Sequence, residues 1–290
     1  MSSTSHEIFP PELEELIFSL AFHNNRKDVM NLILVAKRVH EWLIPEVYKV
    51  TMFYSGEGDV GRLKPSSKNL VHYGQHVRHL MLSTRWGPEK TGLDNLPSEC
   101  LSFCPNVVDI ALWLVDPSSS RQLIDQLLNL PNLTRLSLNL RSFDAPLAND
   151  PSSRELPHPF STVTHLDILG ITAVYTTRQI QQLFPSLTHI AFNRYGVQNS
   201  AIEDVLNAWN SQLKVVVWHH GTSTQPWPEV LPTSEYTQVD DPRLVIMRYS
   251  RGYIEGWYHE AIGRRGLWTM AEEAVKSRRQ ATTPDRVLVG

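Results

Sequence analysis

The first 50 or so residues predict a small helical unit that is apolar on more than one side. In residues 9–22, apolar residues recur at the spacing of an amphipathic helix. They are Leu13, Leu16, Ile17, Leu20 and Ala21. A second helical pattern, residues 28–48, is apolar on two faces. A unit of ~50 residues buries only about 60% of its surface by itself, so either the rest of the chain or a partner protein must cover what is left.

From about residue 66 onward, the pattern apolar-x-x-apolar-x-apolar predicts a series of short strands. Seven copies, 24 to 31 residues apart, begin at Val77, Val107, Leu133, Val163, Leu187, Leu213 and Leu244. Four copies have a proline two residues earlier, where it ends a preceding helix: Pro105, Pro131, Pro185 and Pro242. Amphipathic helices that begin with Ser, Thr or Asn lie between the copies, at residues 118–130, 176–184 and 199–209. Such repetition is typical of a solenoid with a parallel sheet.

This alternation resembles a leucine-rich repeat array with one departure. The Asn that this family places in the turn after each strand is missing from all seven copies, so we expect an irregular array. The alternative is a doubly wound α/β domain, which has the same alternation but helices on both faces of its sheet. The uniform spacing and the lack of a Gly-rich phosphate loop favour the solenoid.

The sequence after residue 252 ends in another amphipathic helix. Its apolar residues are Leu267, Met270, Ala271, Ala274 and Val275. The last repeat of a solenoid leaves an apolar face open, so we expect this helix to cap that end. The expected fold is therefore α/β, with a helical head (1–55), an irregular leucine-rich-repeat-like solenoid with a parallel sheet (56–256) and a C-terminal helical cap and tail (257–290).

A set of residues in the head matches a known family pattern. Phe9-Pro10-x-Glu12-Leu13 with Leu16-Ile17 is followed by Leu34-Val35-x-Lys37-Arg38-x-x-x-Trp42 and Pro45-x-x-Tyr48. Over about 45 residues this order resembles the F-box motif, particularly the F-box-like form of mushroom-type fungi, although Phe9 stands where Leu is usual. In that family the head docks on the linker subunit of SCF-type cullin-RING ubiquitin ligases. The resemblance implies that the docking residues are Phe9, Pro10, Leu13, Ile17, Leu34 and Val35.

The strand positions that alternate with the apolar ones predict an open, polar sheet face. The third positions of the seven copies are His79, Asp109, Arg135, His165, His189, Val215 and Ile246. Since neighbouring strands lie ~4.8 Å apart, Asp109 is expected to face Arg135, and His165 to face His189. An exposed Trp113 favours recognition over a merely solvated face. The substrate-binding concave face is therefore expected to comprise His79, Asp109, Trp113, Arg135, Asn139, His165 and His189.

Two histidine pairs suggest chemistry, and each has a simpler interpretation. His165 and His189 could form a proton-sensitive pair, but two surface histidines are more often neutral and solvated. His219 and His220 look catalytic, but adjacent strand residues point to opposite faces, and no third ligand follows at a suitable spacing. We expect no catalytic residue, metal or cofactor.

Composition narrows the functional classes. The chain has 290 residues, of which 41% are hydrophobic, and its formal net charge is -3. It can bury a core, has no apolar run of ~18 residues for a membrane span, and lacks the positive charge of a nucleic-acid binder. The polar N-terminus resembles no secretory signal. Cys100 and Cys104, one helical turn apart, are interpreted as buried hydrophobes and not as a redox pair, which fits the cytoplasm or nucleus.

These patterns together predict an adaptor and not an enzyme. The head is expected to bind the linker subunit of an SCF-type ubiquitin ligase, and the repeat body to bind an unknown protein substrate. Neither nucleic acid nor membrane is expected as a partner. The alternative is a non-catalytic repeat module whose head packs on its own body, with no ligase role. A hydrolase or transferase that uses His219 is the weakest hypothesis.

Overall fold

The computed structural model describes residues 9–24, 29–54, 67–83, 96–113, 120–139, 160–169, 177–193, 199–209, 211–222, 228–249 and 253–282. These residues form an open, mostly parallel nine-stranded sheet with helices, so the expected α/β class is confirmed. Among the described helices, none combines the length and the apolar character that a bilayer crossing requires.

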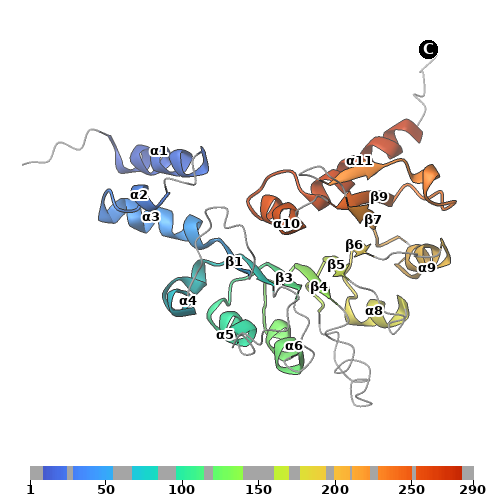
Figure 1. Ribbon diagram of the computed structural model, residues 1–290, viewed down its shortest axis with the longest axis horizontal. Coiled ribbons are helices and arrows are strands. Elements are labelled where there is room, and N and C mark those ends of the chain that lie inside the picture. Colours follow the sequence, from blue (N-terminus) through green and yellow to red (C-terminus); the bar gives the residue numbers. More distant parts are fainter. Residues whose placement is uncertain are drawn as a thin grey trace, which may run out of the picture.

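Three helices at one end of the molecule form the head (Figure 1). They are α1 (Pro11–Asn24), α2 (Val29–Leu32) and α3 (Lys37–Tyr48). Phe22, Val39 and Leu43 form a small core between them, each at most 2% exposed. This core is separate from the core beneath the sheet, and α3 leads directly into the first strand.

The second helical pattern of the head is interrupted, so the expectation of one helix over residues 28–48 is wrong. Residues 33–36 leave the helical conformation, and Ala36 is extended, with φ -159° and ψ 155°. The interruption lets Ile33 and Ala36 pack on the head core while Leu34 and Val35 face solvent. An unbroken helix that is apolar on two sides would have to pack against other elements on both sides, whereas the interrupted segment packs on the head core alone.

The strands follow one another across the sheet in chain order as far as the seventh. They are β1 (Val50–Tyr54), β2 (His79–Ser83), β3 (Asp109–Trp113), β4 (Arg135–Asn139), β5 (His165–Leu169), β6 (His189–Asn193), β7 (Val215–Thr222), β8 (Glu229–Leu231) and β9 (Leu244–Tyr249). The order is β1-β2-β3-β4-β5-β6-β7-β9-β8, and among these pairs only β8 and β9 are antiparallel. Because β1 pairs with β2, the sheet already begins at Val50, within the range 1–55 expected for the head.

The helices that connect the strands lie on one face of the sheet (Figure 1). They are α4 (Ser67–Tyr73), α5 (Leu96–Phe103), α6 (Ser120–Leu128), α8 (Thr177–Leu183) and α9 (Asn199–Trp209), with the short 3-10 helices η2 (Gly74–His76) and η6 (Thr233–Glu235). The apolar residues of the repeated pattern point to these helices and form one continuous core. Alternation along each strand then places the third-position residues on the opposite face.

The strand register confirms most of the pairing expected from the sequence. His79 lies opposite Asp109, Asp109 opposite Arg135, Arg135 opposite His165, and His165 opposite His189. At the last strand the expected register is wrong, because Leu244 pairs with Val216 and not with Leu213. The register shifts near Gly221, whose φ of 76° suits glycine better than any other residue.

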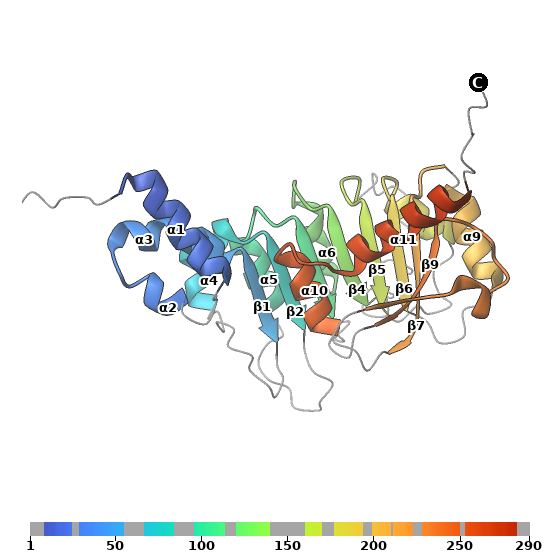
Figure 2. The same cartoon turned by 90° about the horizontal axis from the view of Figure 1, so that it is seen from above.

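Two C-terminal helices cross the opposite face of the sheet. They are α10 (Tyr253–Ala261) and α11 (Leu267–Thr282). Figure 2 shows α11 running over the later strands and α10 over the earlier ones. The expected cap on the end of the array is therefore wrong for these helices. The reason lies in the strands themselves, because this face of β6, β7 and β9 is apolar and needs a cover; its residues include Ala191, Val215, Val217, Val245 and Met247.

Candidate functional site

The head carries a group of exposed apolar side chains, here named the head patch. It consists of Phe9, Leu13, Leu16, Ile17 and Leu20 from the start of the chain and α1, and Leu34 and Val35 from the turn between α2 and α3. Their exposed fractions run from 47% for Phe9 and Leu13 to 78% for Leu34. Pro10, also expected in the docking surface, is exposed as well. Single exposed apolar residues are ordinary, but seven in one small helical unit are typical of an interaction surface.

The orientation of α1 is set by its contacts with α3. Phe18 and Phe22 face the head core, so the Leu13, Leu16, Ile17 and Leu20 stripe faces away from it. The Arg38 guanidinium donates to both carboxylate oxygens of Glu14, at 2.8 and 3.1 Å. Such a two-point contact fixes direction as well as distance. The stripe therefore points outward because its helix is held on its other side.

The sheet face that was expected to be open is covered by α10 and α11. Asp109 is only 5% exposed, and its two carboxylate oxygens are both engaged. One lies 3.2 Å from Nδ1 of His79, and the other accepts a hydrogen bond from Nε1 of Trp257 on α10 at 3.3 Å. The prediction that Asp109 lies on an accessible surface is therefore wrong. The polar residues here satisfy one another and the covering helices.

Arg135 bonds to a covering helix and not across the strands. Its Nη1 lies 3.3 Å from Oε1 of Glu260 on α10. Burial raises the pKa of Glu260 to about 7, although the positive charge of Arg135 and a hydrogen bond from the Trp268 backbone N–H act in the opposite direction. Register alone placed Arg135 opposite Asp109, but the carboxylate from α10 became its partner.

Trp113 is buried, contrary to the expectation of an exposed tryptophan. It is 9% exposed and packs with Met81 and Ala111 beneath Ile254 and Trp257 of α10. Its Nε1 donates to Ser137 Oγ at 2.9 Å, and Ser137 donates in turn to Asp167 at 3.0 Å. A buried indole N–H needs such an acceptor. The side chain of Asn139, the remaining expected contact residue, lies outside the described part of the structure.

Beneath α10 and α11 is a cavity of about 40 Å³. Its polar lining comes from Asp109, Arg135, Ser137, His165, Asp167 and Glu260. A space of this size holds a few water molecules at most. This cavity therefore cannot accept a protein segment while the two helices lie over it.

The residues that suggested other chemistry are placed as follows. His219 is only 1% exposed, so a substrate cannot reach it. Burial also lowers the pKa of this histidine well below its usual value. His220 points to the other side and lies against Tyr236, with the ring centroids 4.6 Å apart. Cys100 and Cys104 are buried in the main core, and burial raises the pKa of each thiol to about 12. Their interpretation as buried hydrophobes is confirmed, because such thiols are poor nucleophiles and poor redox groups.

Several side chains that sequence reasoning did not single out come from α10 and α11. They are Trp257, Glu260, Trp268 and Glu272. Two of them are tryptophans in amphipathic segments. Since large aromatic side chains in such a pattern are usually buried, these tryptophans could have indicated that the helices pack against another element.

The head patch and the covered sheet face are the two features on which a function can be argued. No protein-family model matches the chain, and no curated protein matches it. The basis for a function is therefore the geometry of these two regions.

Proposed function

We propose that this chain is a substrate-recognition adaptor of an SCF-type cullin-RING ubiquitin ligase, whose F-box-like head docks on the linker subunit. The head patch carries the proposal. It contains five of the six docking residues that the family resemblance implies, and the sixth, Pro10, lies beside Phe9 and is exposed. Burying half-exposed Leu, Ile and Phe side chains against a partner contributes about 1 kcal/mol each.

The body is proposed to be an irregular leucine-rich-repeat-like solenoid. Two observations support this over a doubly wound domain. The strands β1 to β7 follow in chain order, and the helices that connect them share one face. In a doubly wound sheet the strand order reverses at one point and the connecting helices lie on both faces.

In this proposal the chain positions the substrate and does not catalyse a reaction itself. One chain holds both the linker subunit and the substrate, which raises the effective concentration of the substrate near the ligase. Because α10 and α11 fill the sheet face, the substrate is held by other exposed surfaces of the body. The cytoplasm or nucleus, where such ligases act, is the proposed location.

The test is direct binding of the full chain to the immobilised linker subunit. The double change Leu13→Asp and Ile17→Asp places two charges in the head patch, and we expect it to weaken capture by about 100-fold or more, about tenfold for each buried anchor. Val71→Asp is the matched control, since Val71 is 57% exposed on α4 and lies outside the patch. Circular dichroism would show that all variants stay folded.

Two results would refute the proposal. If the double variant is captured as well as the wild type, the docking surface is assigned wrongly. If the wild-type chain itself is not captured, the alternative holds, namely a repeat module without a ligase role. In that alternative the head packs on the body, and the exposure of the head patch disfavours such packing.

A further inference from the structure

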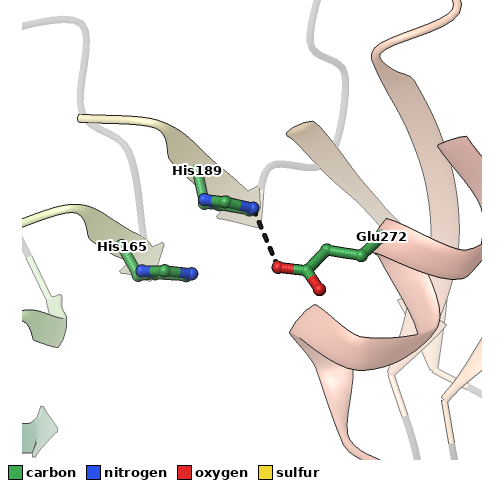
Figure 3. A group of neighbouring side chains, drawn as sticks. All are labelled: His165, His189 and Glu272. Atoms are coloured by element: carbon green, nitrogen blue, oxygen red, sulfur yellow. Dashed lines mark ion pairs between the residues drawn. The ribbon is translucent and has the colours of Figure 1, made fainter. Parts of the chain in front are cut away.

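Three potential metal ligands from three separate elements meet at the edge of the covered face. They are His165 at the start of β5, His189 at the start of β6 and Glu272 on α11 (Figure 3). One ligand atom from each lies within 4.8 Å of the other two. The imidazole rings are stacked, with centroids 4.1 Å apart, and both project toward Glu272 (Figure 3). Glu272 Oε1 lies 3.1 Å from Nε2 of His189.

The neighbouring threonine hydroxyls contact Nδ1 of each ring. The hydroxyl oxygen of Thr164 lies 2.9 Å from Nδ1 of His165, and that of Thr188 lies 2.7 Å from Nδ1 of His189. Each hydroxyl also lies within hydrogen-bond distance of a backbone carbonyl, Thr164 of Thr134 at 3.3 Å and Thr188 of Thr164 at 3.2 Å. When a hydroxyl donates to its carbonyl, its oxygen accepts from Nδ1–H. The lone pair of each neutral ring is then on Nε2, the nitrogen that projects toward Glu272.

In the tautomer with its proton on Nδ1, His189 presents the Nε2 lone pair toward Glu272 Oε1 at 3.1 Å, and both atoms can then bind one cation. In the other tautomer Nε2–H donates to Glu272, so metal binding selects the first.

We propose that Nε2 of His165, Nε2 of His189 and a carboxylate oxygen of Glu272 bind a divalent cation of borderline softness, with Zn²⁺ as the best fit. Two imidazoles and one carboxylate suit such an ion, whereas Ca²⁺ and Mg²⁺ prefer oxygen ligands alone. Ligands about 2.0–2.1 Å from a tetrahedral zinc lie about 3.3 Å from one another, close to the 3.1 Å observed. Because the rings are parallel, each must turn toward the other to share one ion.

The surroundings define the role and the strength of this site. Trp268 packs at a steep angle against both rings, at 5.2 and 5.7 Å between centroids. The bound ion would connect α11 to β5 and β6, holding the cover on the sheet. A groove of about 660 Å³ beside His189 and Glu272 leaves the fourth coordination position open to water. Lys214 and Arg135 oppose a second positive charge, so we expect micromolar and not picomolar affinity.

The experiment is calorimetric titration of the chelator-treated full chain with Zn²⁺, repeated with Co²⁺ to record its absorption spectrum. We expect one ion per chain and the visible bands of tetrahedral Co²⁺. Glu272→Gln should weaken binding by about tenfold or more, since it replaces an anionic ligand with a neutral amide. Glu272 is more than half exposed, so this change leaves folding intact. Glu273→Gln is the matched control on the same helix turn.

The histidines are tested by His165→Phe and His189→Phe, which keep an aromatic ring beneath Trp268 and remove the ligand nitrogen. Each should abolish the Co²⁺ bands while the protein stays folded. The proposal is overturned if the wild type binds no ion, or if Glu272→Gln and His189→Phe bind as tightly as the wild type. Neither outcome affects capture by the linker subunit, so the metal site and the adaptor role are tested independently.

Discussion

Helices α1 and α11 have the same apolar spacing and opposite surroundings. On α1, Leu13, Leu16, Ile17 and Leu20 are about half exposed. On α11, the equivalent stripe packs on the sheet, with Ala271 and Val275 buried. The difference lies in the opposing surface, because β6, β7 and β9 offer α11 an apolar face, whereas the core beneath α1 is filled by Phe18 and Phe22 from its other side. Periodicity thus predicts an apolar face but not what covers it.

Among changes that test the difference between α1 and α11, we expect Trp268→Ala to have the largest effect on the free energy of unfolding. Trp268 is 7% exposed and covers both His165 and His189. Removing a buried tryptophan costs about 3–5 kcal/mol in the free energy of unfolding. We expect a loss of that size in urea denaturation with chelator present. Thr269→Ala, at the exposed neighbouring position, should change the free energy by less than about 0.5 kcal/mol.

A small loss for Trp268→Ala, below about 1 kcal/mol, would break the contrast. It would mean that α11 contributes little to the folded body and lies on the sheet only loosely. The sheet face would then be accessible to a substrate for part of the time.

The next effect is a pH dependence from Glu260. Its pKa is raised from 4.5 to about 7, so between these values the folded chain holds a proton that the unfolded chain has released. The free energy of unfolding therefore falls as pH rises through this window, by about 3 kcal/mol in total. Glutamine does not titrate, so we expect the unfolding free energy of the Glu260→Gln variant not to decrease in this way as pH rises. The measurement is the change in unfolding free energy between pH 5 and 8, compared between wild type and variant.

The histidines do not obscure that comparison. Their pKa values are lowered, so they reduce stability as pH falls below 6.5, and they do so equally in both proteins. Equal pH dependence in wild type and Glu260→Gln would show that Glu260 is solvated and that α10 does not close over it.

The parts of the fold that were predictable from the sequence depend on local spacing. The repeated strand pattern and its prolines predicted which residues face one another from His79 to His189, because each repeat adds one strand beside the previous one. β1 was missed because it lies outside the repeated pattern. The last register failed because Leu244 pairs with Val216, three residues beyond the Leu213 that the repeat pattern gives, and this offset is already present before the irregularity near Gly221.

The candidate site was less predictable because it depends on contacts between distant segments. The strand residues His165 and His189 were placed correctly on one face, but Glu272 reaches them from α11. Trp113 was expected to be exposed, but Ile254 and Trp257 of α10 pack over its cluster. The apolar stripe of α1 was the exception, because helical spacing acts over a short stretch of chain.

The smallest effect is expected from the head patch, and it tests the other half of the contrast. Leu16 and Leu20 are each 55% exposed, so Leu16→Ser with Leu20→Ser removes little buried surface and should lower the free energy of unfolding by less than about 1 kcal/mol. Leu43→Ala, in the fully buried head core, should cost about 2–5 kcal/mol. Thermal and urea unfolding measure both. If the exposed pair costs as much as Leu43→Ala, the stripe on α1 is covered by the chain itself, and a partner would have no apolar surface there to bury.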